Sequence, residues 1–252
     1  MDIARVLALY DAEVRARPQA QPGFAVEHID GLALITGPFN FVSAWDLTAA
    51  DAPRVIAAQA ARFRARGESL LWRVHDHDGP PGMAGLLAEA GFTASEATTL
   101  MILDLMDPNA LIDWPPDVEV RRVASLSELD GLVRAEERAF GEAEAWRRDA
   151  YSGRLNDPDL GLYVAYVDGA PVASARLELS PAWSFGLLQG GGVAAEYRGR
   201  GLYRALTAAR VGAAQARGLS YLVTDARETS RPILERLGFS PAARAALWVL
   251  QP

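Results

Sequence analysis

Residues 190–206 read GGGVAAEYRGRGLYRAL, and this stretch decides how the second half of the chain is interpreted. The residues just before it, 183–188, have the aromatic and aliphatic density of a β-strand. Apolar residues then recur at helical spacing, at Leu202, Leu206, Ala209, Ala213 and Ala216. Three arginines fall outside that stripe: Arg204, Arg210 and Arg217. The pattern predicts a strand, a glycine-bearing loop and then a helix.

The predicted loop has the features of an anion-binding site. The first turn of a helix leaves backbone N–H groups without partners, and the helix dipole favours negative charge there. Gly199 and Gly201 lack a Cβ, so an oxyanion can approach the main chain closely. Arg198 and Arg200 add positive charge at the same place. The stretch can therefore cradle a diphosphate, although an ordinary strand-to-helix turn with solvated arginines has the same pattern.

Two well-known phosphate-binding loops do not fit the sequence. A Walker P-loop ends in Gly-Lys-Ser/Thr, and the chain contains no lysine. A dinucleotide-binding fingerprint needs G-x-G-x-x-G, and Arg204 stands where the third glycine is required.

Two other motifs resemble those of the GNAT family of N-acyltransferases. The run RGRGLY, which starts at Arg198, resembles the family's pyrophosphate loop, Gln/Arg-x-x-Gly-x-Gly/Ala, through Arg198 and Gly201. It departs from that pattern at Tyr203, where the family has a small residue. Residues 232–239, PILERLGF, resemble the late helix that ends in Leu-Gly-Phe before the family's last strand. The resemblance covers roughly residues 118–250.

This resemblance implies an α/β fold with a mixed sheet and a function. The implied reaction moves an acetyl or other acyl group from acetyl-CoA, as co-substrate, to an amine of a small molecule or peptide by direct attack, without a metal. In the family, the strand before the loop splays from its neighbour, and its backbone binds the pantetheine and the thioester. Gly190–Gly192 suits such a departure from pairing, or a bulge that binds nothing. The resemblance assigns coenzyme A to Gly192, Val193, Ala194, Arg198, Gly199, Arg200, Gly201, Leu202 and Tyr203.

The catalytic groups are less clear than the coenzyme A loop. Leu234 stands where the family often has a tyrosine that protonates the leaving thiolate. Ser230, Thr229 and Tyr203 are substitutes, although Ser230 also suits a helix N-cap and Tyr203 also suits packing. The thiolate could also leave unassisted.

Glu196, beside the loop, and Glu178, on the polar face of a strand, are the candidate bases. Each is also explained as an ordinary surface carboxylate. The leucine at position 234 leaves a second function open, a catalytically silent acyl-CoA-binding or regulatory module with the same fold.

The two halves of the chain resemble each other, which predicts tandem GNAT-like domains. LLAEAGF at residues 86–92 parallels ILERLGF at residues 233–239, and each lies between two predicted strands. The first half lacks the RGRG run. We therefore expect a degenerate GNAT-like domain at residues 1–112, a proline-containing linker at 113–117 and the acetyltransferase domain at 118–252.

Composition narrows the remaining possibilities. The chain has no cysteine, no apolar run long enough to span a membrane and a net charge of −7. We expect a cytoplasmic protein, monomeric or homodimeric, without membrane or nucleic-acid partners, although Arg198, Arg200 and Arg204 form a local basic patch. No metal site is expected: His75-Asp-His-Asp78 is interpreted as a solvated strand end.

Overall fold

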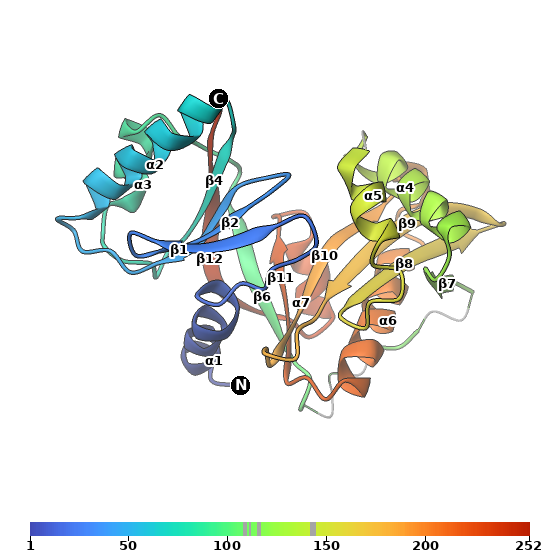
Figure 1. Cartoon of the computed structure of the whole chain (residues 1–252). Coiled ribbons are helices and arrows are strands. Elements are labelled where there is room, and N and C mark those ends of the chain that lie inside the picture. The colour runs from blue at the N-terminus through green and yellow to red at the C-terminus, as the bar shows by residue number, and fades with distance from the viewer. Residues whose placement is uncertain (108–109, 111, 115–116, 142–144) are drawn as a thin grey trace. The chain divides into compact units, whose positions relative to one another are not determined.

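The computed structural model describes residues 1–107, 110, 112–114, 117–141 and 145–252 (Figure 1). The chain forms two compact units. Unit 1 comprises residues 1–101, 225–232 and 241–252, and unit 2 comprises residues 102–224 and 233–240. The division falls within strands β6 (Thr98–Asp104) and β11 (Tyr221–Ala226), and within the short helix α7 (Arg231–Arg236). Residues 115 and 116 of the expected linker lie outside the described residues, and the two-domain division stays a prediction.

Unit 1 is a mixed sheet with helices on it. Its strands are hydrogen-bonded in the order β1-β2-β3-β4-β12, and β5 pairs with β12. Only the β3–β4 pairing among these neighbours is parallel. The elements are α1 (Ile3–Tyr10), the π-helical turn η1 (Asp11–Arg15), β1 (Ala25–Ile29), β2 (Leu32–Thr36), β3 (Phe41–Trp45), α2 (Ala52–Arg66), β4 (Leu70–His75), α3 (Met83–Glu89), β5 (Thr93–Ala94) and β12 (Ser240–Leu250).

The core of unit 1 lies between the strands and the helices α2 and α3. Trp72 of β4, Phe63 of α2 and Leu87 of α3 are completely buried in it. The sequence predicts α2 with the correct ends because proline stands in its first turn and Gly67 closes it in a left-handed conformation. The apolar stripe expected on this helix, which includes Val55, is buried.

Unit 2 contains most of the elements that the GNAT resemblance implies, but the last strand of that order, β12, falls in unit 1. The strands of unit 2 are hydrogen-bonded in the order β11-β10-β9-β8-β7, and only the β10–β11 pairing is parallel. The elements are β7 (Glu119–Arg122), α4 (Leu126–Phe140), α5 (Ala145–Ser152), β8 (Leu160–Val167), β9 (Ala170–Glu178), β10 (Phe185–Val193), the 3₁₀ turn η2 (Ala195–Tyr197) and α6 (Leu202–Ala216). Residues 142–144, between α4 and α5, lie outside the described residues.

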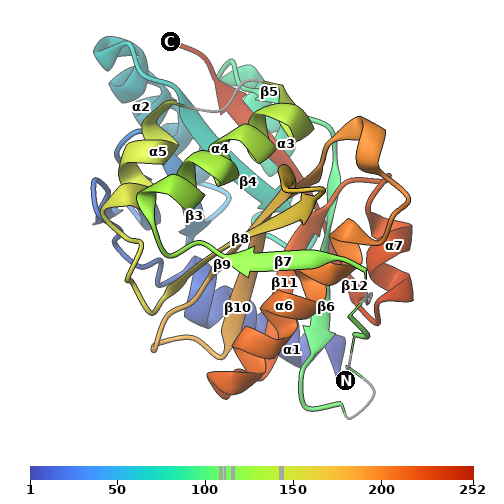
Figure 2. The same ribbon diagram turned by 90° about the vertical axis from the view of Figure 1, so that its right-hand side faces the viewer.

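The helices of unit 2 cover both faces of its sheet. Figures 1 and 2 show α4 and α5 on one side of β8 and β9, and α6 on the other. The hairpin between β8 and β9 turns at Asp168 and Gly169, both with positive φ, as the sequence predicts for a tight Asp-Gly turn. No helix in the described part of the chain is long and apolar enough to cross a bilayer.

Candidate acyl-transfer site

The strand β10 carries a bulge and loses one of its neighbours. Its pairing with β9 changes register between Gln189 and Gly192, and Gly190 has a φ of +58°. The expected bulge is therefore present. The parallel pairing with β11 covers only residues 185–187 of β10. The next carbonyl, that of Leu188, accepts a hydrogen bond from the Thr224 hydroxyl at 2.9 Å. Beyond that point the backbone of β10 departs from regular two-sided pairing.

Glycines in the bulge make room for both covering helices. A Cβ on Gly192 would lie 2.4 Å from the Phe140 ring of α4. A Cβ on Gly191 would lie 3.1 Å from the Tyr203 ring of α6. Adjacent residues of a strand point to opposite faces, so the two glycines let α4 and α6 approach β10 from opposite sides.

The loop after β10 presents main-chain groups where the sequence predicts a diphosphate cradle. Gly199 and Gly201 have φ values of +75° and +78°, a left-handed conformation that favours glycine. Gly201 directly precedes α6, and no side chain caps the first N–H groups of that helix. The side chains of Arg198 and Arg200 are exposed beside them. The arrangement combines free donors, positive charge and no Cβ in the path of an anion.

Tyr203 does not obstruct this cradle, because its side chain turns inward. The ring packs under Gly191, and the hydroxyl lies beside the guanidinium of Arg210, seven residues along the same helix. Burial raises the pKa of Tyr203, against the opposing effect of Arg210. The departure from the family's small residue is thus compensated by a glycine on β10. A buried phenol with a raised pKa is a poor match for a proton donor that must reach the cradle.

The expected exposure of Arg210 is wrong. The side chain is 1% exposed and lies on the buried side of α6 with Leu206 and Val211. Its Nε donates to the Leu206 carbonyl at 3.0 Å, and its Nη1 donates to the Arg176 carbonyl at 3.3 Å. An arginine outside an apolar stripe is expected to face solvent. Arg210 is buried instead because the two carbonyl oxygens satisfy its N–H groups.

A second buried guanidinium, that of Arg176 on β9, lies on the opposite face. It contacts the Tyr151 hydroxyl and the amide oxygen of Gln189, and its Nε lies 2.9 Å from a Glu178 carboxylate oxygen. The Nε–carboxylate contact is an ion pair without aligned hydrogen-bond geometry. Burial lowers the pKa of Arg176, but Glu178, Tyr151 and Glu136 outweigh it and raise the pKa. The network fixes β9, β10 and α5 around the bulge.

The two candidate bases are not brought together. Glu196 lies in η2, is exposed and pairs with Arg138 at 3.4 Å. Glu178 faces inward and pairs with Arg176, so its interpretation as an ordinary surface carboxylate is wrong. Glu178 lies opposite Leu187 at the start of the splay, whereas Glu196 follows Val193. Those positions are six residues apart, roughly 20 Å along the strand.

Two positions near the Leu-Gly-Phe helix, Ser230 and Leu234, bear on which group protonates the leaving thiolate. The Ser230 hydroxyl donates to the Arg227 carbonyl at 3.1 Å. Within the described residues, this hydroxyl does not accept a hydrogen bond from an N–H group of α7, so it does not act as the expected N-cap. Leu234, at the position of the family's tyrosine, is 1% exposed and serves as core.

The His75–Asp78 segment of unit 1 is a solvated strand end only in part, because Asp76 and His77 are exposed whereas the side chains of His75 and Asp78 are largely buried. His75 is 2% exposed, and the Asp78 carboxylate accepts from the His75 backbone N–H at 2.7 Å and from Arg15. Burial lowers the pKa of His75. The expectation failed for Asp78 because Arg15, 63 residues away, brings the charge that buries it. No group of three or more metal-ligating side chains occurs among the described residues.

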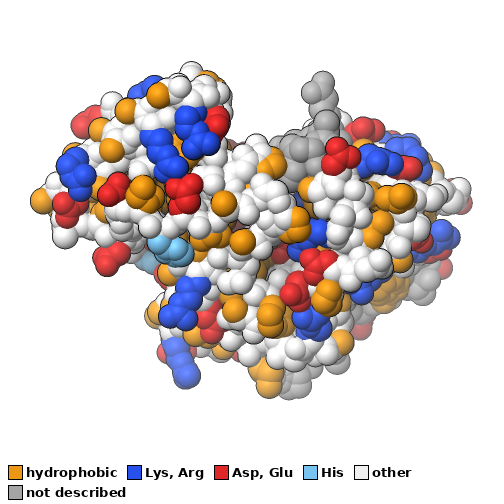
Figure 3. Space-filling view, in the orientation of Figure 1, with side chains coloured by type: hydrophobic (Ala, Val, Ile, Leu, Met, Phe, Trp, Pro, Cys, Tyr) orange, Lys and Arg blue, Asp and Glu red, His pale blue; other side chains and the backbone are white. Residues whose placement is uncertain are grey.

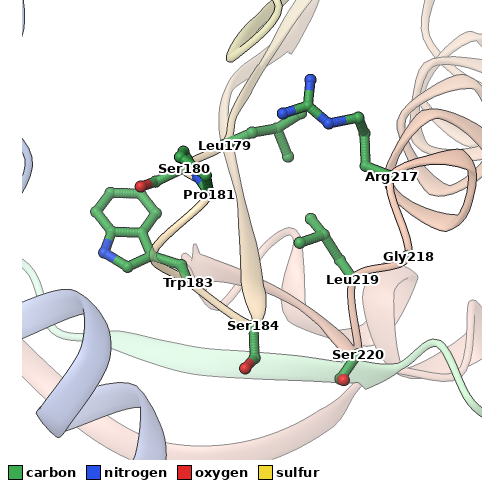
Figure 4. A pocket seen from close by; sticks show the side chains of 9 residues that line it. All are labelled: Leu179, Ser180, Pro181, Trp183, Ser184, Arg217, Gly218, Leu219 and Ser220. Atoms are coloured by element: carbon green, nitrogen blue, oxygen red, sulfur yellow. The ribbon is translucent and has the colours of Figure 1, made fainter.

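One cavity in unit 2, of about 260 Å³, lies away from the cradle. Residues 179–184, between β9 and β10, line one side of it, and residues 217–220, between α6 and β11, line the other (Figure 4). The cradle is at the opposite ends of β10 and α6. The connection at 180–183 therefore lies at the far end of β10 from the bulge.

Comparison with known proteins finds a matching family model and solved structures with a similar fold. The sequence model of the Acetyltransferase (GNAT) family matches residues 126–239. A GCN5-related N-acetyltransferase from Kribbella flavida has a TM-score of 0.71 at 20% identity, over 100% of this chain and 96% of that one. A similar protein from Sphaerobacter thermophilus gives 0.67 at 16%, over 99% and 91%. A tandem GNAT protein from the clavulanic acid biosynthesis pathway gives 0.66 at 19%, over 99% and 94%.

No curated protein matched the sequence. At such identities the structural likenesses show the fold, and the matched segment holds both sequence motifs and the bulged strand. The matched family model and the fold likeness support assignment of residues 126–239 to the GNAT family of acetyltransferases.

Proposed function

We propose that the protein is an acetyl-CoA-dependent N-acyltransferase that acts on an amine of a small molecule or a peptide. The observation that carries the proposal is the junction of β10 and α6. A bulged strand that leaves its parallel neighbour runs into a loop with two left-handed glycines and an uncapped helix start. One end suits a thioester and its amide-containing arm, and the other suits a diphosphate.

The residues present fit coenzyme A. The first-turn N–H groups of α6 and the exposed Arg198 and Arg200 would hold the diphosphate. Gly192, Val193 and Ala194 would offer main-chain groups to the pantetheine. The Ala194 N–H already donates to the Val172 carbonyl at 2.9 Å, and the Val193 carbonyl accepts from Arg198 Nε at 3.3 Å. These two groups would have to exchange those bonds for bonds to the pantetheine.

The chemistry needs orientation more than strong acid or base groups. Attack by the amine nitrogen on the thioester carbon forms a C–N bond and moves an electron pair onto the carbonyl oxygen. Return of that pair breaks the C–S bond, and the thiolate leaves with its electrons while the amine proton passes to water or a carboxylate. Holding the two reactants in line can supply a large part of the acceleration. Glu178, half-buried at the start of the splay, is the better placed of the two candidate bases.

The test measures binding and turnover separately. Acetyl-CoA at millimolar concentration should raise the melting temperature, since it binds only the folded chain. Free thiol should then appear when amines are added, with mass spectrometry of the acceptor to locate the acetyl group. Binding should fail in Gly201→Val. The proposal is wrong if neither a shift nor thiol release occurs across a broad panel of amines.

A second candidate is an acyl-CoA-binding or regulatory module without activity. The burial of Leu234 in the core favours it, because no side chain there can donate a proton to a thiolate. A melting shift with acetyl-CoA but no thiol release with any amine would support this alternative.

Charge argues against nucleic acid as a partner. The net charge is −7, and Figure 3 shows acidic and basic side chains interspersed on the face in view. Arg204, the third member of the basic patch, pairs with Asp113 at 3.2 Å. Failure to retain DNA or RNA at low salt is the expected result.

A further inference from the structure

Arg210 is a buried cation without a counter-charge. Its side chain is 1% exposed and donates to two carbonyl oxygens and to the Thr207 hydroxyl, the last at 3.4 Å. Within the described part of the chain, no carboxylate pairs with it, and the neighbouring titratable groups are the phenols Tyr203 and Tyr163. A guanidinium stays protonated at neutral pH. The interior on this face of the sheet therefore carries a net positive charge.

The unpaired charge of Arg210 is not explained by a contribution to the stability of the fold. Removing an ion from water costs free energy that only a well-placed counter-ion offsets, and replacing buried charge by apolar groups is often stabilising. The other face of the same strands shows the usual solution, because Arg176 there is balanced by Glu178. The contrast indicates that the charge of Arg210 serves something beyond the packing of α6.

The position of the guanidinium beneath β10 suggests the function of its charge. Its Nη2 lies 3.6 Å from the point where a Cβ on Gly191 would stand, directly under the bulge of β10. Its Nη1 donates to the carbonyl of Arg176, whose residue pairs with Gln189 immediately before the bulge. The Tyr203 ring packs against the same glycine. The cation is thus fixed against the backbone segment that departs from regular pairing.

We propose that Arg210 is a positioning residue whose fixed positive charge, beneath the bulge of β10, stabilises the negative charge that develops on the thioester oxygen during acyl transfer. This inference rests on the proposed function, because it requires the thioester to lie along β10. Attack by the amine moves an electron pair onto the carbonyl oxygen, and its return expels the thiolate. A preorganised charge in a water-poor interior favours that distribution without any need to reorient.

The experiment compares Arg210→Met, neutral and of similar length, with Arg210→Lys, which keeps the charge. Arg217→Met is the matched control, since Arg217 ends the same helix, is exposed and pairs with Asp159 at 2.6 Å. In Arg210→Met we expect kcat to fall about tenfold, acetyl-CoA affinity to stay within about twofold and the free energy of unfolding to equal or exceed the parent's. Arg210→Lys should recover most of kcat, and Arg217→Met should behave as the parent.

The outcomes separate this role from a structural one. A less stable Arg210→Met protein with the parent's kcat overturns the inference. Should Arg210→Met fail to fold because the Tyr203 hydroxyl loses its partner, Tyr203→Phe/Arg210→Met, compared with Tyr203→Phe, replaces it and must show the same loss of kcat. If the parent itself releases no thiol, the proposed function fails. The inference then fails with it, whereas a parent that releases thiol with the same kcat as Arg210→Met overturns the inference alone.

Discussion

Arg15 and Asp78, which lie 63 residues apart, form a two-pronged ion pair inside unit 1, with Nη1–Oδ1 and Nη2–Oδ2 distances of 2.8 Å. The pair fills a gap between two diverging strands. The parallel pairing of β3 and β4 ends at Val42 and Trp72. Beyond it, Arg15 Nε donates to the Ser43 carbonyl of β3 at 3.2 Å, and Asp78 accepts from the backbone of β4.

Breaking this pair should destabilise unit 1 strongly. Asp78→Asn removes the two-pronged partner of the buried Arg15 and leaves it only the more exposed Asp11, at 2.8 Å, as a counter-ion. Loss of one partner of a buried pair costs about 3–5 kcal/mol, and Asp11 should offset part of that cost. Urea unfolding of the parent and of Asp78→Asn measures the difference. The matched control is Asp130→Asn, which removes an exposed carboxylate paired with Arg148 at 2.9 Å and should cost less than about 1 kcal/mol. Equal effects of the two substitutions would contradict the assigned role.

The same pair predicts how stability depends on acid. Burial raises the pKa of Asp78, but hydrogen bonds from His75 and Arg15 outweigh it and hold the pKa well below its usual range. A carboxyl group of this kind contributes stability above its unfolded-state pKa, about 4, and loses it as the pH falls further. The free energy of unfolding should therefore decline below about pH 4 more steeply in the parent than in Asp78→Asn.

His75 predicts a separate, milder window at higher pH. Burial lowers its pKa in the folded state, so the unfolded chain binds a proton that the folded chain excludes. Stability should decline as the pH falls below about 6.5, the unfolded-state pKa of histidine. His75→Phe, which cannot titrate, should lose that part of the slope. An identical slope in parent and variant between about pH 6.5 and 5 would show that another group is responsible.

The filled gap in unit 1 bears on the number of coenzyme A sites. In unit 2, the strand that precedes the cradle leaves its parallel neighbour and keeps glycines in the bulge. In unit 1, Arg15 and Asp78 already occupy the backbone groups of β3 and β4 at the equivalent divergence. We therefore expect one acetyl-CoA per chain by titration calorimetry. Two sites of comparable affinity would show that the first half is not degenerate.

The sequence predicts the backbone conformation of this protein better than it predicts the burial of its charged side chains. The ends of α2 and the turn at Asp168 follow from proline and glycine positions, because those residues restrict the local backbone. The bulge of β10 was predictable for the same reason. The burial of Asp78 and Arg210 was not, because each depends on acceptors or counter-ions from distant segments. A pattern of apolar residues assigns such side chains to solvent by default.

The sequence likewise predicts only part of the candidate site. The glycines of the cradle could be identified from the RGRG run, and both adopt the left-handed conformation that gives glycine its advantage. The inward turn of Tyr203 had one usable signal, the glycine run on the preceding strand. No local pattern could reveal that Gly191 is the residue beneath which that ring packs, because the contact joins a helix to a strand.

Gly192 should be essential for the fit of α4 against β10. A Cβ there would lie 2.4 Å from the Phe140 ring and 2.9 Å from the Ala139 side chain. Gly192→Ala should cost about 1–3 kcal/mol of stability by overpacking. The double variant Gly192→Ala/Phe140→Ala should recover part of that loss, since the ring is the nearer obstacle. A cycle of single and double variants in urea measures the coupling, and strictly additive effects would contradict the contact.

Gly201 provides the sharpest test of the cradle. It has a φ of +78° at the start of α6, and Gly218 has a φ of +70° just after its end, with nothing within 4 Å of a Cβ at Gly218. Valine should strain the backbone by about 1–3 kcal/mol at either position. Only Gly201→Val places a branched side chain where a diphosphate would approach. Arg198→Ala should weaken affinity by about 1–3 kcal/mol, because it removes one charge-assisted bond.

Titration of the three variants with acetyl-CoA, with melting temperatures as the control for folding, distinguishes strain from loss of the site. We expect Gly201→Val to lose measurable binding, Arg198→Ala to keep weakened binding and Gly218→Val to bind as the parent does. If folded Gly201→Val retains the affinity of the parent, the diphosphate does not lie on the start of α6. Equal losses in Gly201→Val and Gly218→Val would instead assign the effect to backbone strain, because both positions have a positive φ beside an end of α6.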